Sequence, residues 1–438
     1  MRICASLGSA DDLCSEDIAS ADIVEIRTDI FDRIPENALR KRQTGLITFK
    51  GPVREDMIPE GWIADIGNED TARMKNETIS SYHDFDGTPE DGELRNVMGA
   101  MKGDIIKGAF AVNSIDDLVR LFDLSQRIGK RHVIIGMGEL GTITRIRSDL
   151  MGNEFTFAYV GKETAPGQLS VREMICLGET PMITGIVGSG IGYTRSPAMH
   201  NAAFGHLRIK GKYLVFDTPS LDRIGEMMLD YNVRGVNVTK PYKTDMIDHL
   251  DSCDIASMEI GAVNTVVNDD GRLKGYNTDV LGIEKAFGMN SIEVDGKRAL
   301  ILGAGGAARS CAYFLSNNGC SVTITGRNED SVKKVASELS VTARERTSVA
   351  VKAYDIIVNC TPIGMKNNIL DYPVRIEQIH RSQTVFDMVY GETHLSNLAN
   401  ERGCTAIHGE DMLAYQGMRS FELFTSKKVS YKVMRDAV

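Results

Sequence analysis

Residues 298–308 read RALILGAGGAA, a short apolar run followed directly by a glycine-rich turn. The run Arg298–Leu302 predicts a β-strand, and Gly303–Ala308 predicts a turn that opens a helix. Glycines at such a junction allow a tight turn and close approach to a pyrophosphate, and a helix N-terminus favours the negative charge. Further predicted strands follow at Ser321–Thr325, Ile356–Asn359 and Thr384–Met388. The stretch therefore predicts a nucleotide-binding α/β domain with a parallel sheet.

The second predicted strand of this domain ends in Gly326-Arg327-Asn328, about 20 residues beyond the glycine loop. Enzymes that use NAD place an acidic residue there for the ribose 2′-hydroxyl, whereas an arginine suits the 2′-phosphate of NADP. An ordinary surface arginine is the alternative. The pattern favours NADP, with these candidate contacts: Gly303, Ala304, Gly305, Gly306, Ala307, Arg327 and Asn328.

The first part of the chain repeats a short apolar strand followed by a polar, turn-rich or helical stretch. The expected strands are Arg2–Leu7, Ile23–Phe31, Gly45–Phe49, Trp62–Ile66, Thr78–His83, Asp104–Phe110, His132–Met137 and Phe155–Tyr159. Eight such strands suggest a closed (β/α)₈ barrel, and because that fold typically takes ~250 residues its helices must be short here. An open doubly wound sheet has the same pattern. A Gly, a Pro and a new strand at Met182–Val187 mark the end of this part.

Composition limits the classes of function. A chain of 438 residues has room for two or three domains, and its net charge of −10 disfavours nucleic-acid or anionic-membrane binding. No apolar run reaches the roughly 20 residues that cross a bilayer. The eight cysteines show no metal-ligand spacing, which argues against a zinc site and a disulfide framework. We expect reduced thiols, a cytoplasmic location and no metal.

Charged side chains stand on three predicted barrel strands. Alternate strand residues share a face, so Glu25, Arg27 and Asp29 would project together. His83 ends a strand, where barrels hold active sites, and imidazole carries protons near neutral pH. Lys107 lies in an apolar strand, where burial lowers the pKa of the amine, and a neutral amine can form a Schiff base with a ketone. Each feature has an alternative. Glu25, Arg27 and Asp29 would form structural salt bridges, His83 would be a surface or hydrogen-bonded core residue, and Lys107 would be a structural lysine whose amine reaches the solvent.

Together with MGELGTITR at 137–145 and TAPGQ at 164–168, these residues resemble type I 3-dehydroquinate dehydratase in order and spacing, over nearly all of residues 1–175. The resemblance implies a Schiff-base elimination in which Lys107 forms the imine, His83 moves the protons and Arg145 holds the substrate carboxylate. It implies further contacts to substrate or to a closing loop at Glu25, Arg27, Lys50, Thr164 and Gln168.

The chain departs from that family at three places. Lys50 stands where the family usually has an arginine, and no Glu-Gly-Gly triplet follows it. Glu55 is a loose candidate for the missing glutamate, because it fits only after a shift of one position. Thr164 replaces the usual serine and keeps the hydroxyl. The set of Lys107, His83 and Arg145 is intact, so we expect activity.

Four polar clusters precede the glycine loop: TRSPAMHN at 194–201, NVTKPYK at 237–243, AVNT at 262–265 and NTD at 277–279. Short hydroxyl, amide, lysine and aspartate side chains suit a polyhydroxylated ligand, although each cluster alone is ordinary turn chemistry. With DMVY at 387–390 and MLAYQ at 412–416, they resemble shikimate dehydrogenase over residues 182–425.

This second resemblance implies that Lys243 donates a proton to the substrate carbonyl while NADPH delivers hydride, with Asp279 holding substrate and lysine in line. Expected substrate contacts are Thr194, Ser196, Asn237, Thr239, Asn264, Tyr390 and Gln416. Tyr193 and Thr194 replace a His-Ser pair common in the family, Gly190 stands at a proline position and Pro362 replaces a frequent serine. These changes spare Lys243 and Asp279.

The two resemblances imply an α/β protein with a (β/α)₈ barrel followed by a two-domain dehydrogenase that has a C-terminal Rossmann-like NADP domain. We expect the barrel at 1–178, a shikimate-binding domain at 179–283 and 407–438, and the NADP domain at 284–406. Such a chain would be bifunctional, converting 3-dehydroquinate to 3-dehydroshikimate and then to shikimate.

Its expected partners are these small molecules, with no nucleic acid and no membrane, and a homodimer is left open. One alternative is a working dehydrogenase with a non-catalytic barrel that serves binding or assembly. Another is catabolic quinate or shikimate oxidation with NAD, against which Arg327 argues.

Overall fold

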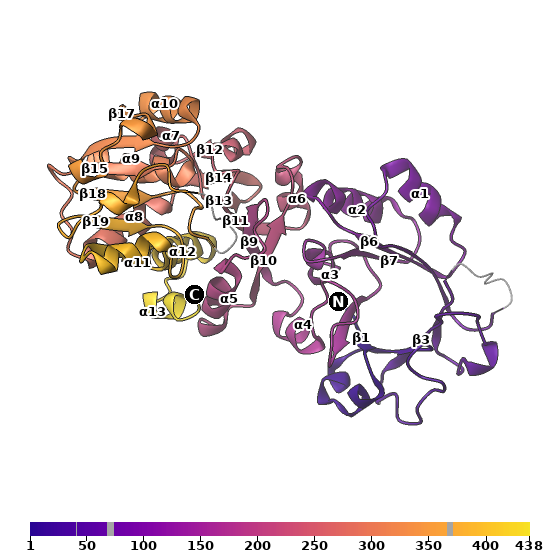
Figure 1. Ribbon diagram of the computed structural model, residues 1–438. Coiled ribbons are helices and arrows are strands. Elements are labelled where there is room, and N and C mark those ends of the chain that lie inside the picture. The colour runs from indigo at the N-terminus through magenta and orange to yellow at the C-terminus, as the bar shows by residue number, and fades with distance from the viewer. Residues whose placement is uncertain (41, 68–73, 366–370) are drawn as a thin grey trace. The chain divides into compact units, whose positions relative to one another are not determined.

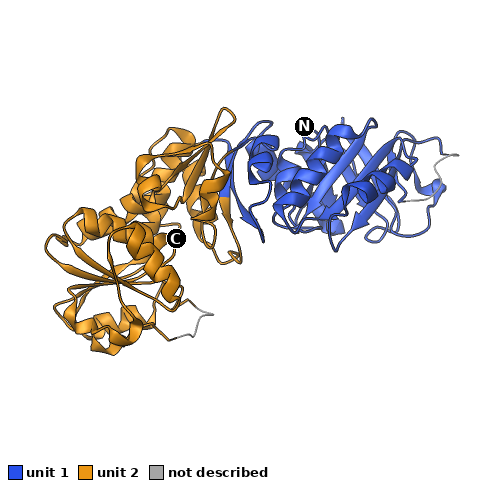
Figure 2. Ribbon diagram, turned by 90° about the horizontal axis from the view of Figure 1, so that it is seen from above, with its two compact units in different colours: residues 1–185, 209–233 blue, residues 186–208, 234–438 orange. Residues whose placement is uncertain are grey.

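The computed structural model describes residues 1–40, 42–67, 74–365 and 371–438. It divides into two compact units, which Figure 2 colours separately. Unit 1 comprises residues 1–185 and 209–233, and unit 2 comprises residues 186–208 and 234–438. Each unit is described by itself below.

Unit 1 contains eight parallel strands arranged as a ring (Figure 1). They are β1 Ile3–Leu7, β2 Ile23–Arg27, β3 Thr44–Thr48, β4 Ile63–Asp65, β5 Thr78–Asp84, β6 Ile105–Ala111, β7 His132–Met137 and β8 Thr156–Val160. Their order is β7-β6-β5-β4-β3-β2-β1-β8. Among the described residues no ladder joins β7 to β8. There the Glu154 N–H donates to the carbonyl of His132, and the side chain of Asn153 bonds both backbone groups of Ile134. The predicted barrel is confirmed, with a side chain closing its last gap.

The helices of the barrel are unevenly distributed. The α-helices of its second half are α1 Asp91–Ala100, α2 Ile115–Arg127, α3 Thr142–Ile146 and α4 Val171–Leu177. In the described part of the first half, the connections carry 3-10 helices: η1 Ala10–Cys14, η2 Glu16–Ser20 and η3 Glu55–Met57. Side chains of η3 and of the loops, such as Met57 and Trp62, cover the outer face of β3 and β4 in place of α-helices. Trp62 packs so closely on β3 that a Cβ at Gly45 would lie 2.1 Å from its ring.

Unit 1 also includes a segment from later in the sequence. Strand β9 (Met182–Gly188) begins in this unit, and β10 (Gly211–Asp217) lies beside it. Helix α6 (Ile224–Asp230) follows and packs against α2 of the barrel, as Figure 1 shows. Residues 209–233 are therefore part of the barrel unit.

Unit 2 begins with the end of β9 and holds a mixed sheet of order β9-β11-β13-β14-β12. Its elements are α5 Ser196–His206, β11 Val233–Val238, η4 Asp245–His249, β12 Ser252–Cys253, α7 Ile255–Ile260, β13 Thr265–Asp269 and β14 Arg272–Tyr276. Strand β13 pairs antiparallel with both β11 and β14, which places Asn264 and Thr265 beside Asn237.

The second sheet of unit 2 has the order β17-β16-β15-β18-β19-β20, and its neighbouring strands run parallel. Its strands are β15 Arg298–Leu302, β16 Ser321–Thr325, β17 Thr342–Ala343, β18 Ile356–Asn359, β19 Thr384–Asp387 and β20 Thr405–His408. The order reverses between β15 and β18, and ligands of such sheets bind at the carboxyl ends of the strands at this point. The predicted Rossmann-like fold is confirmed.

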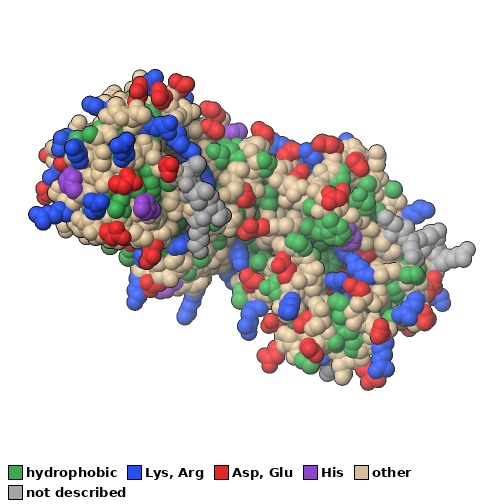
Figure 3. All heavy atoms as spheres, in the orientation of Figure 1, with side chains coloured by type: hydrophobic (Ala, Val, Ile, Leu, Met, Phe, Trp, Pro, Cys, Tyr) green, Lys and Arg blue, Asp and Glu red, His purple; other side chains and the backbone are tan. Residues whose placement is uncertain are grey.

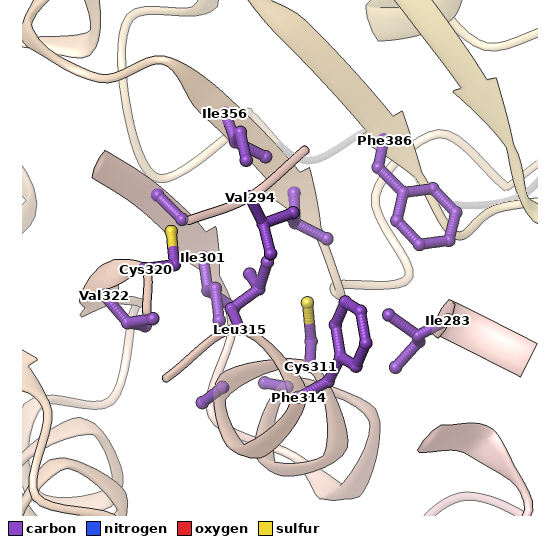
Figure 4. Close-up of a cluster of buried hydrophobic side chains, with 14 of the residues drawn as sticks. Ile283, Val294, Ile301, Cys311, Phe314, Leu315, Cys320, Val322, Ile356 and Phe386 are labelled. Atoms are coloured by element: carbon purple, nitrogen blue, oxygen red, sulfur yellow. The ribbon is translucent and has the colours of Figure 1, made fainter. Parts of the chain in front are cut away.

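Helices cover both faces of this sheet. They are α8 Asp279–Met289, α9 Gly306–Asn317, α10 Glu329–Glu338, α11 His394–Glu401, α12 Gly409–Thr425 and α13 Tyr431–Arg435, with the 3-10 helices η5 Arg346–Ser348, η6 Val351–Ala353 and η7 Ile376–Gln378. Alternate residues of β15 point to opposite faces. Ile301 joins Phe314 of α9 and Phe386 in one buried cluster (Figure 4), whereas Leu300 packs with Leu395 on the other face.

On the face seen in Figure 3, acidic and basic side chains are intermixed. In the described parts of the chain no helix is both long and apolar enough to cross a membrane. Nor do the described residues bring three or more His, Cys, Asp or Glu side chains together as metal ligands.

Candidate active sites

A buried lysine–aspartate pair lies inside the barrel. Lys107 on β6 places its Nζ 3.0 Å from Oδ2 of Asp65 on β4, and the hydroxyl of Ser81 on β5 donates to Oδ1 of the same carboxylate at 2.6 Å. The Lys107 amine also lies 4.4 Å from the ring centroid of Phe157. The lysine side chain is 7% exposed and the aspartate 2%. Three neighbouring strands thus hold the amine at a fixed place in a dry interior.

The protonation of Lys107 differs from the sequence expectation. Burial lowers the pKa of its amine, but the charges of Asp65 and Glu25 outweigh burial and raise the pKa above the ordinary value. The expectation of a lowered pKa was wrong because it considered burial without the buried carboxylates. The amine is therefore charged in the free protein and has to lose a proton before it can attack a carbonyl.

His83 lies on β5, two residues beyond Ser81, which is the register partner of Lys107. It therefore stands on the same face and closer to the carboxyl ends of the strands. Burial, reinforced by the charges of Lys107 and Lys50, lowers the pKa of His83 to about 4. Its ring stacks on that of Phe85 with centroids 6.0 Å apart. A neutral imidazole at this place is able to accept a proton at neutral pH.

The charged residues of β2 separate into two roles. Glu25 is buried and accepts hydrogen bonds from the hydroxyls of Ser6 and of Thr48, the latter at 2.7 Å. Arg27 forms a two-point ion pair with Asp29, with distances of 3.1 and 2.6 Å. The structure thus brings Glu25 into the interior near Lys107, while Arg27 and Asp29 form the salt bridge that the sequence offered as an alternative.

Arg145 on α3 is 2% exposed. Its Nε has no hydrogen-bond partner among the described residues. Burial lowers the pKa of its guanidinium to about 10, opposed by the charge of Glu163. A buried guanidinium with an unused donor suits an anionic ligand, because leaving such a donor unsatisfied is costly.

The loop between β8 and α4 is braced by its own side chains. Oε1 of Gln168 accepts from the hydroxyl of Thr164 at 2.7 Å and from its N–H at 3.0 Å. A cavity of about 550 Å³ lies beside this loop, lined by Glu139, Thr142, Glu163, Thr164, Ala165, Pro166 and Gly167. Lys50 is exposed, and its N–H donates to the hydroxyl of Thr28. Glu55, the loose substitute for a family glutamate, is also exposed, in η3.

Asp65 and Ser81 are site residues that the sequence reasoning did not select. Asp65 lies within the predicted strand Trp62–Ile66, and a charge inside such an apolar strand is the same signal that pointed to Lys107. Because the partner of each charge lies on a strand far away in sequence, the pair becomes visible only in the folded barrel.

Unit 2 contains a cavity of about 630 Å³ between its two sheets. All sixteen residues selected from the sequence of this part line it: Thr194, Ser196, Asn237, Thr239, Lys243, Asn264, Asp279, Gly303, Ala304, Gly305, Gly306, Ala307, Arg327, Asn328, Tyr390 and Gln416. They come from eight separated stretches of sequence, so folding gathers them into one site.

A hydrogen-bonded network surrounds Lys243 in this cavity. Its Nζ lies 2.5 Å from Oδ2 of Asp279 at the start of α8. The amide of Asn264 donates to Oδ1 of Asp279 at 2.8 Å and to the hydroxyl of Thr278 at 3.0 Å. It also lies 3.4 Å from Oε1 of Gln416 on α12. Asp279 is thus fixed from one side by an amide and from the other by the lysine, whose side chain is 17% exposed to the cavity.

The glycine loop follows β15 at the switch point of the sheet. Gly303 has φ +116°, a conformation that favours glycine. A Cβ at Gly305 would meet nothing within 4 Å, so the backbone there faces open space. A Cβ at Gly306 would lie 2.7 Å from Cβ of Lys243, so this glycine lets the lysine approach the helix. Open backbone before α9 is the setting in which a pyrophosphate binds.

The edges of the cavity carry cations and aromatic rings. The guanidinium carbon of Arg195 lies 5.9 Å from the ring centroid of Tyr390, and Nζ of Lys240 lies 4.9 Å from that of Tyr193. Burial, with a smaller contribution from Asp279, raises the pKa of Tyr390, so its hydroxyl stays protonated. Arg327 is exposed, whereas the side chain of Asn328 caps α10 by accepting from the Ser331 N–H at 2.9 Å.

Models of known families match both parts of the chain. The type I 3-dehydroquinase model matches residues 57–177, and the shikimate dehydrogenase substrate binding domain matches 186–266. The shikimate / quinate 5-dehydrogenase model matches 284–388 and the shikimate 5′-dehydrogenase C-terminal domain matches 409–438. The chain belongs to the shikimate dehydrogenase family, fused to a type I 3-dehydroquinase domain. It therefore joins a lyase domain to an oxidoreductase in one bifunctional shikimate-pathway protein.

Curated and solved relatives cover the dehydrogenase part. Shikimate dehydrogenase (NADP(+)) of Dehalococcoides mccartyi is 37% identical over 264 residues, which are 57% of this chain and 92% of the relative. The crystal structure of shikimate dehydrogenase from Aquifex aeolicus matches with a TM-score of 0.56 and 31% identity, covering 59% of this chain and 97% of the other. The Thermus thermophilus enzyme in complex with NADP(H) and shikimate matches with 0.54 and 32%, covering 58% and 98%.

Proposed function

We propose that this chain catalyses two consecutive reactions, the Schiff-base dehydration of 3-dehydroquinate to 3-dehydroshikimate and the NADPH-dependent reduction of that product to shikimate. The observation that carries the proposal is that each unit holds one lysine–aspartate pair, Lys107 with Asp65 and Lys243 with Asp279, inside a polar site built from family motifs. The product of the first reaction is the substrate of the second, which gives a reason for the fusion.

In the dehydration, Lys107 starts as an ammonium, and the proton that it gives up leaves on the carbonyl oxygen as water, so that the imidazole of His83 is still neutral when the iminium has formed. The free amine condenses with the C3 ketone and releases water, and the resulting iminium makes the C2 proton acidic. His83 removes that proton and returns it to the departing C1 hydroxyl, which leaves as water. Hydrolysis of the iminium consumes one water and frees Lys107, so the net change is loss of one water. Arg145 holds the substrate carboxylate.

In the reduction, NADPH supplies a hydride to the C3 carbonyl carbon of 3-dehydroshikimate when it is bound. Lys243 gives a proton to the carbonyl oxygen, and Asp279 holds the ammonium in line. Asn264 orients Asp279 through its amide. The hydroxyl and amide groups of Thr194, Ser196, Asn237, Thr239 and Gln416 bind the substrate, and buried Tyr390 lies beside it.

The residues of the glycine loop fit the cofactor. Gly305 leaves open space where a pyrophosphate would approach, at the N-terminus of α9. Arg327 offers a cation at the edge of the same cavity, as a 2′-phosphate requires. We assign Gly303, Ala304, Gly305, Gly306, Ala307, Arg327 and Asn328 to NADP. By sequence family, the three parts are 1–178, 179–283 with 407–438, and 284–406, although residues 209–233 pack within the barrel unit. A cytoplasmic location and a homodimer stay predictions.

The decisive experiment supplies 3-dehydroquinate with NADPH and follows shikimate formation together with nicotinamide absorbance. We expect both in the intact protein. Lys107→Ala should abolish NADPH oxidation from 3-dehydroquinate and keep it from 3-dehydroshikimate. Borohydride should trap a substrate adduct on Lys107 of the intact protein only.

Two outcomes would contradict the proposal. Unchanged turnover of 3-dehydroquinate by the Lys107→Ala variant would refute the Schiff-base assignment. Reduction of 3-dehydroshikimate without any consumption of 3-dehydroquinate by the intact protein would support the alternative of a non-catalytic barrel.

A further inference from the structure

Residues 209–233 lie in the barrel unit, although the type I 3-dehydroquinase model ends at residue 177 and the shikimate dehydrogenase substrate binding domain covers 186–266. Within unit 1 this segment packs along the barrel through α6 and α2. A piece of sequence from the dehydrogenase family is thus built into the body of the dehydratase.

Tyr231, just after α6, is fully buried, with 0% exposure. Its hydroxyl donates to the carbonyl of Leu118 in α2 at 2.9 Å, and its ring packs edge-on against Phe122 with centroids 5.3 Å apart. The same hydroxyl lies 4.0 Å from Sδ of Met151. Its backbone carbonyl accepts a hydrogen bond from Nη1 of Arg147 at 3.3 Å. Tyr231 therefore holds both α2 and the connection between α3 and β8.

Arg147 joins this contact to the candidate active site. It directly follows α3, and its N–H donates to the carbonyl of Ile143 at 2.8 Å, which closes the last turn of the helix. Its side chain is 4% exposed and reaches Asp149 at 3.3 Å as well as the carbonyl of Tyr231. Arg145 stands two residues earlier on the same short helix. A five-residue helix has little stability of its own, so its position depends on such contacts.

A second group of contacts attaches α6 to α2 without touching α3. Arg223 forms ion pairs with Asp116 at 3.2 Å and with Asp123 at 3.4 Å. Earlier in the segment, Lys212 pairs with Glu173 of α4 at 2.9 Å. These partly exposed ion pairs attach the segment to α2 and α4. The buried contact of Tyr231 is made with Arg147, which follows the helix that carries Arg145.

We propose that residues 209–233 are a working part of the dehydratase, and that Tyr231, acting through Arg147, positions Arg145 for the substrate carboxylate. Arg147 and Tyr231 are positioning residues that touch no substrate. The inference rests on the proposed dehydratase function. It means that a segment of the dehydrogenase sequence sets the affinity of the other active site for its substrate.

The test compares Arg147→Met with Arg223→Met in the full-length protein. Arg147→Met keeps much of the apolar stem and removes the donor to Tyr231, so we expect the KM for 3-dehydroquinate to rise about fivefold or more with a smaller change of kcat. Arg147→Lys keeps one donor and should restore part of the loss. Arg223→Met removes attachment only and should leave KM unchanged. Borohydride trapping counts the active fraction, so that loss of folded protein is not read as a change of kcat.

Amide hydrogen exchange of residues 142–151 gives a readout that does not need activity. We expect faster exchange in Arg147→Met and not in Arg223→Met. An unchanged KM with unchanged exchange in Arg147→Met would overturn the inference, as would an equal rise of KM in both variants. If the intact protein neither turns over nor traps 3-dehydroquinate, the proposed function fails, and the exchange comparison still decides whether the segment orders α3.

Discussion

In the proposed function, Lys107 and Lys243 serve two different reactions because their surroundings differ. Lys107 is enclosed by the barrel strands and faces Asp65, Phe157 and the imidazole of His83, which suits an amine that becomes covalently attached. Lys243 borders a large cavity beside the start of α9, which suits an ammonium that gives a proton to a ligand and recovers it from water. In both cases a carboxylate fixes the amine, so position and not residue type separates the two chemistries.

The low pKa of His83 predicts an unusual pH profile for the dehydratase. The neutral form is the base, so activity should persist as pH falls through 6.5, the ordinary value for histidine, and should be lost near pH 4. The acid limb of kcat/KM for 3-dehydroquinate measures this. Lys50→Met removes a charge that lowers the pKa, so it should move the limb to higher pH. An acid limb near 6.5 in the intact protein would contradict the assignment of His83 as the base.

Arg327 should decide between the two nicotinamide cofactors. Replacing it by Gln removes the cation next to the expected 2′-phosphate, and we expect the KM for NADPH to rise about tenfold while that for NADH changes little. Initial rates of 3-dehydroshikimate reduction with each cofactor measure this. Equal effects on both cofactors would show that Arg327 does not read the 2′-phosphate, and better use of NADH by the intact protein would favour the catabolic alternative.

Two adjacent glycines in the turn between β15 and α9 meet different requirements. Gly306 leaves room for Lys243, and Gly305 leaves open space for a pyrophosphate. Gly306→Ala would place a methyl group 2.7 Å from Cβ of Lys243 and push that lysine away from Asp279, so kcat of the reduction should fall about tenfold or more. Gly305→Ala places its methyl group in open space and should instead raise the KM for NADPH, because the methyl occupies the place of the pyrophosphate. Steady-state kinetics with NADPH separate the two effects. Indistinguishable variants would refute this division.

The barrel shows that a fold can keep its strands while it loses its helices. The helices in the described connections of its first half are short 3-10 helices, yet Ile47 and Ala64 are fully buried. Trp62, in a loop, and Met57, in η3, cover these two side chains, and such a connection uses fewer residues than an α-helix would. Glu25, Asp65, His83 and Lys107 lie on strands, so the ladders hold them in place without the missing helices.

The proposed function gives each unit one active site, which permits a complementation test on the whole protein. Lys107→Ala retains the site for reduction, and Lys243→Met retains the site for dehydration, so neither should convert 3-dehydroquinate to shikimate alone. An equimolar mixture should do so, because 3-dehydroshikimate is able to diffuse from one protein molecule to another. Shikimate formation with NADPH measures this. A mixture that stays inactive although each variant keeps its own half-reaction would show that the intermediate is not released.

Local patterns predicted much of the fold. The strands Arg298–Leu302 and Ser321–Thr325 were predicted with the bounds that the structure has, since an apolar run and the turn that ends it are neighbours in sequence. Likewise, the sixteen residues chosen from motifs in the dehydrogenase part all line one cavity. Asp65 and the Asn153 bridge between β7 and β8 were not predicted, because each gains its role from a partner on another strand.

Sequence motifs were sufficient to give the two families, the order of the domains along the chain and the residue types of each reaction, because motif residues lie close together and keep their spacing. The tertiary structure decided the properties that depend on contacts between residues far apart in sequence. The pKa of Lys107 rises because Asp65 and Glu25 come near it, against the effect of burial. Tyr231 enters the dehydratase because α6 packs on α2. Electrostatic and packing energies fall off over a few ångströms, so these contacts exist only once the chain is folded.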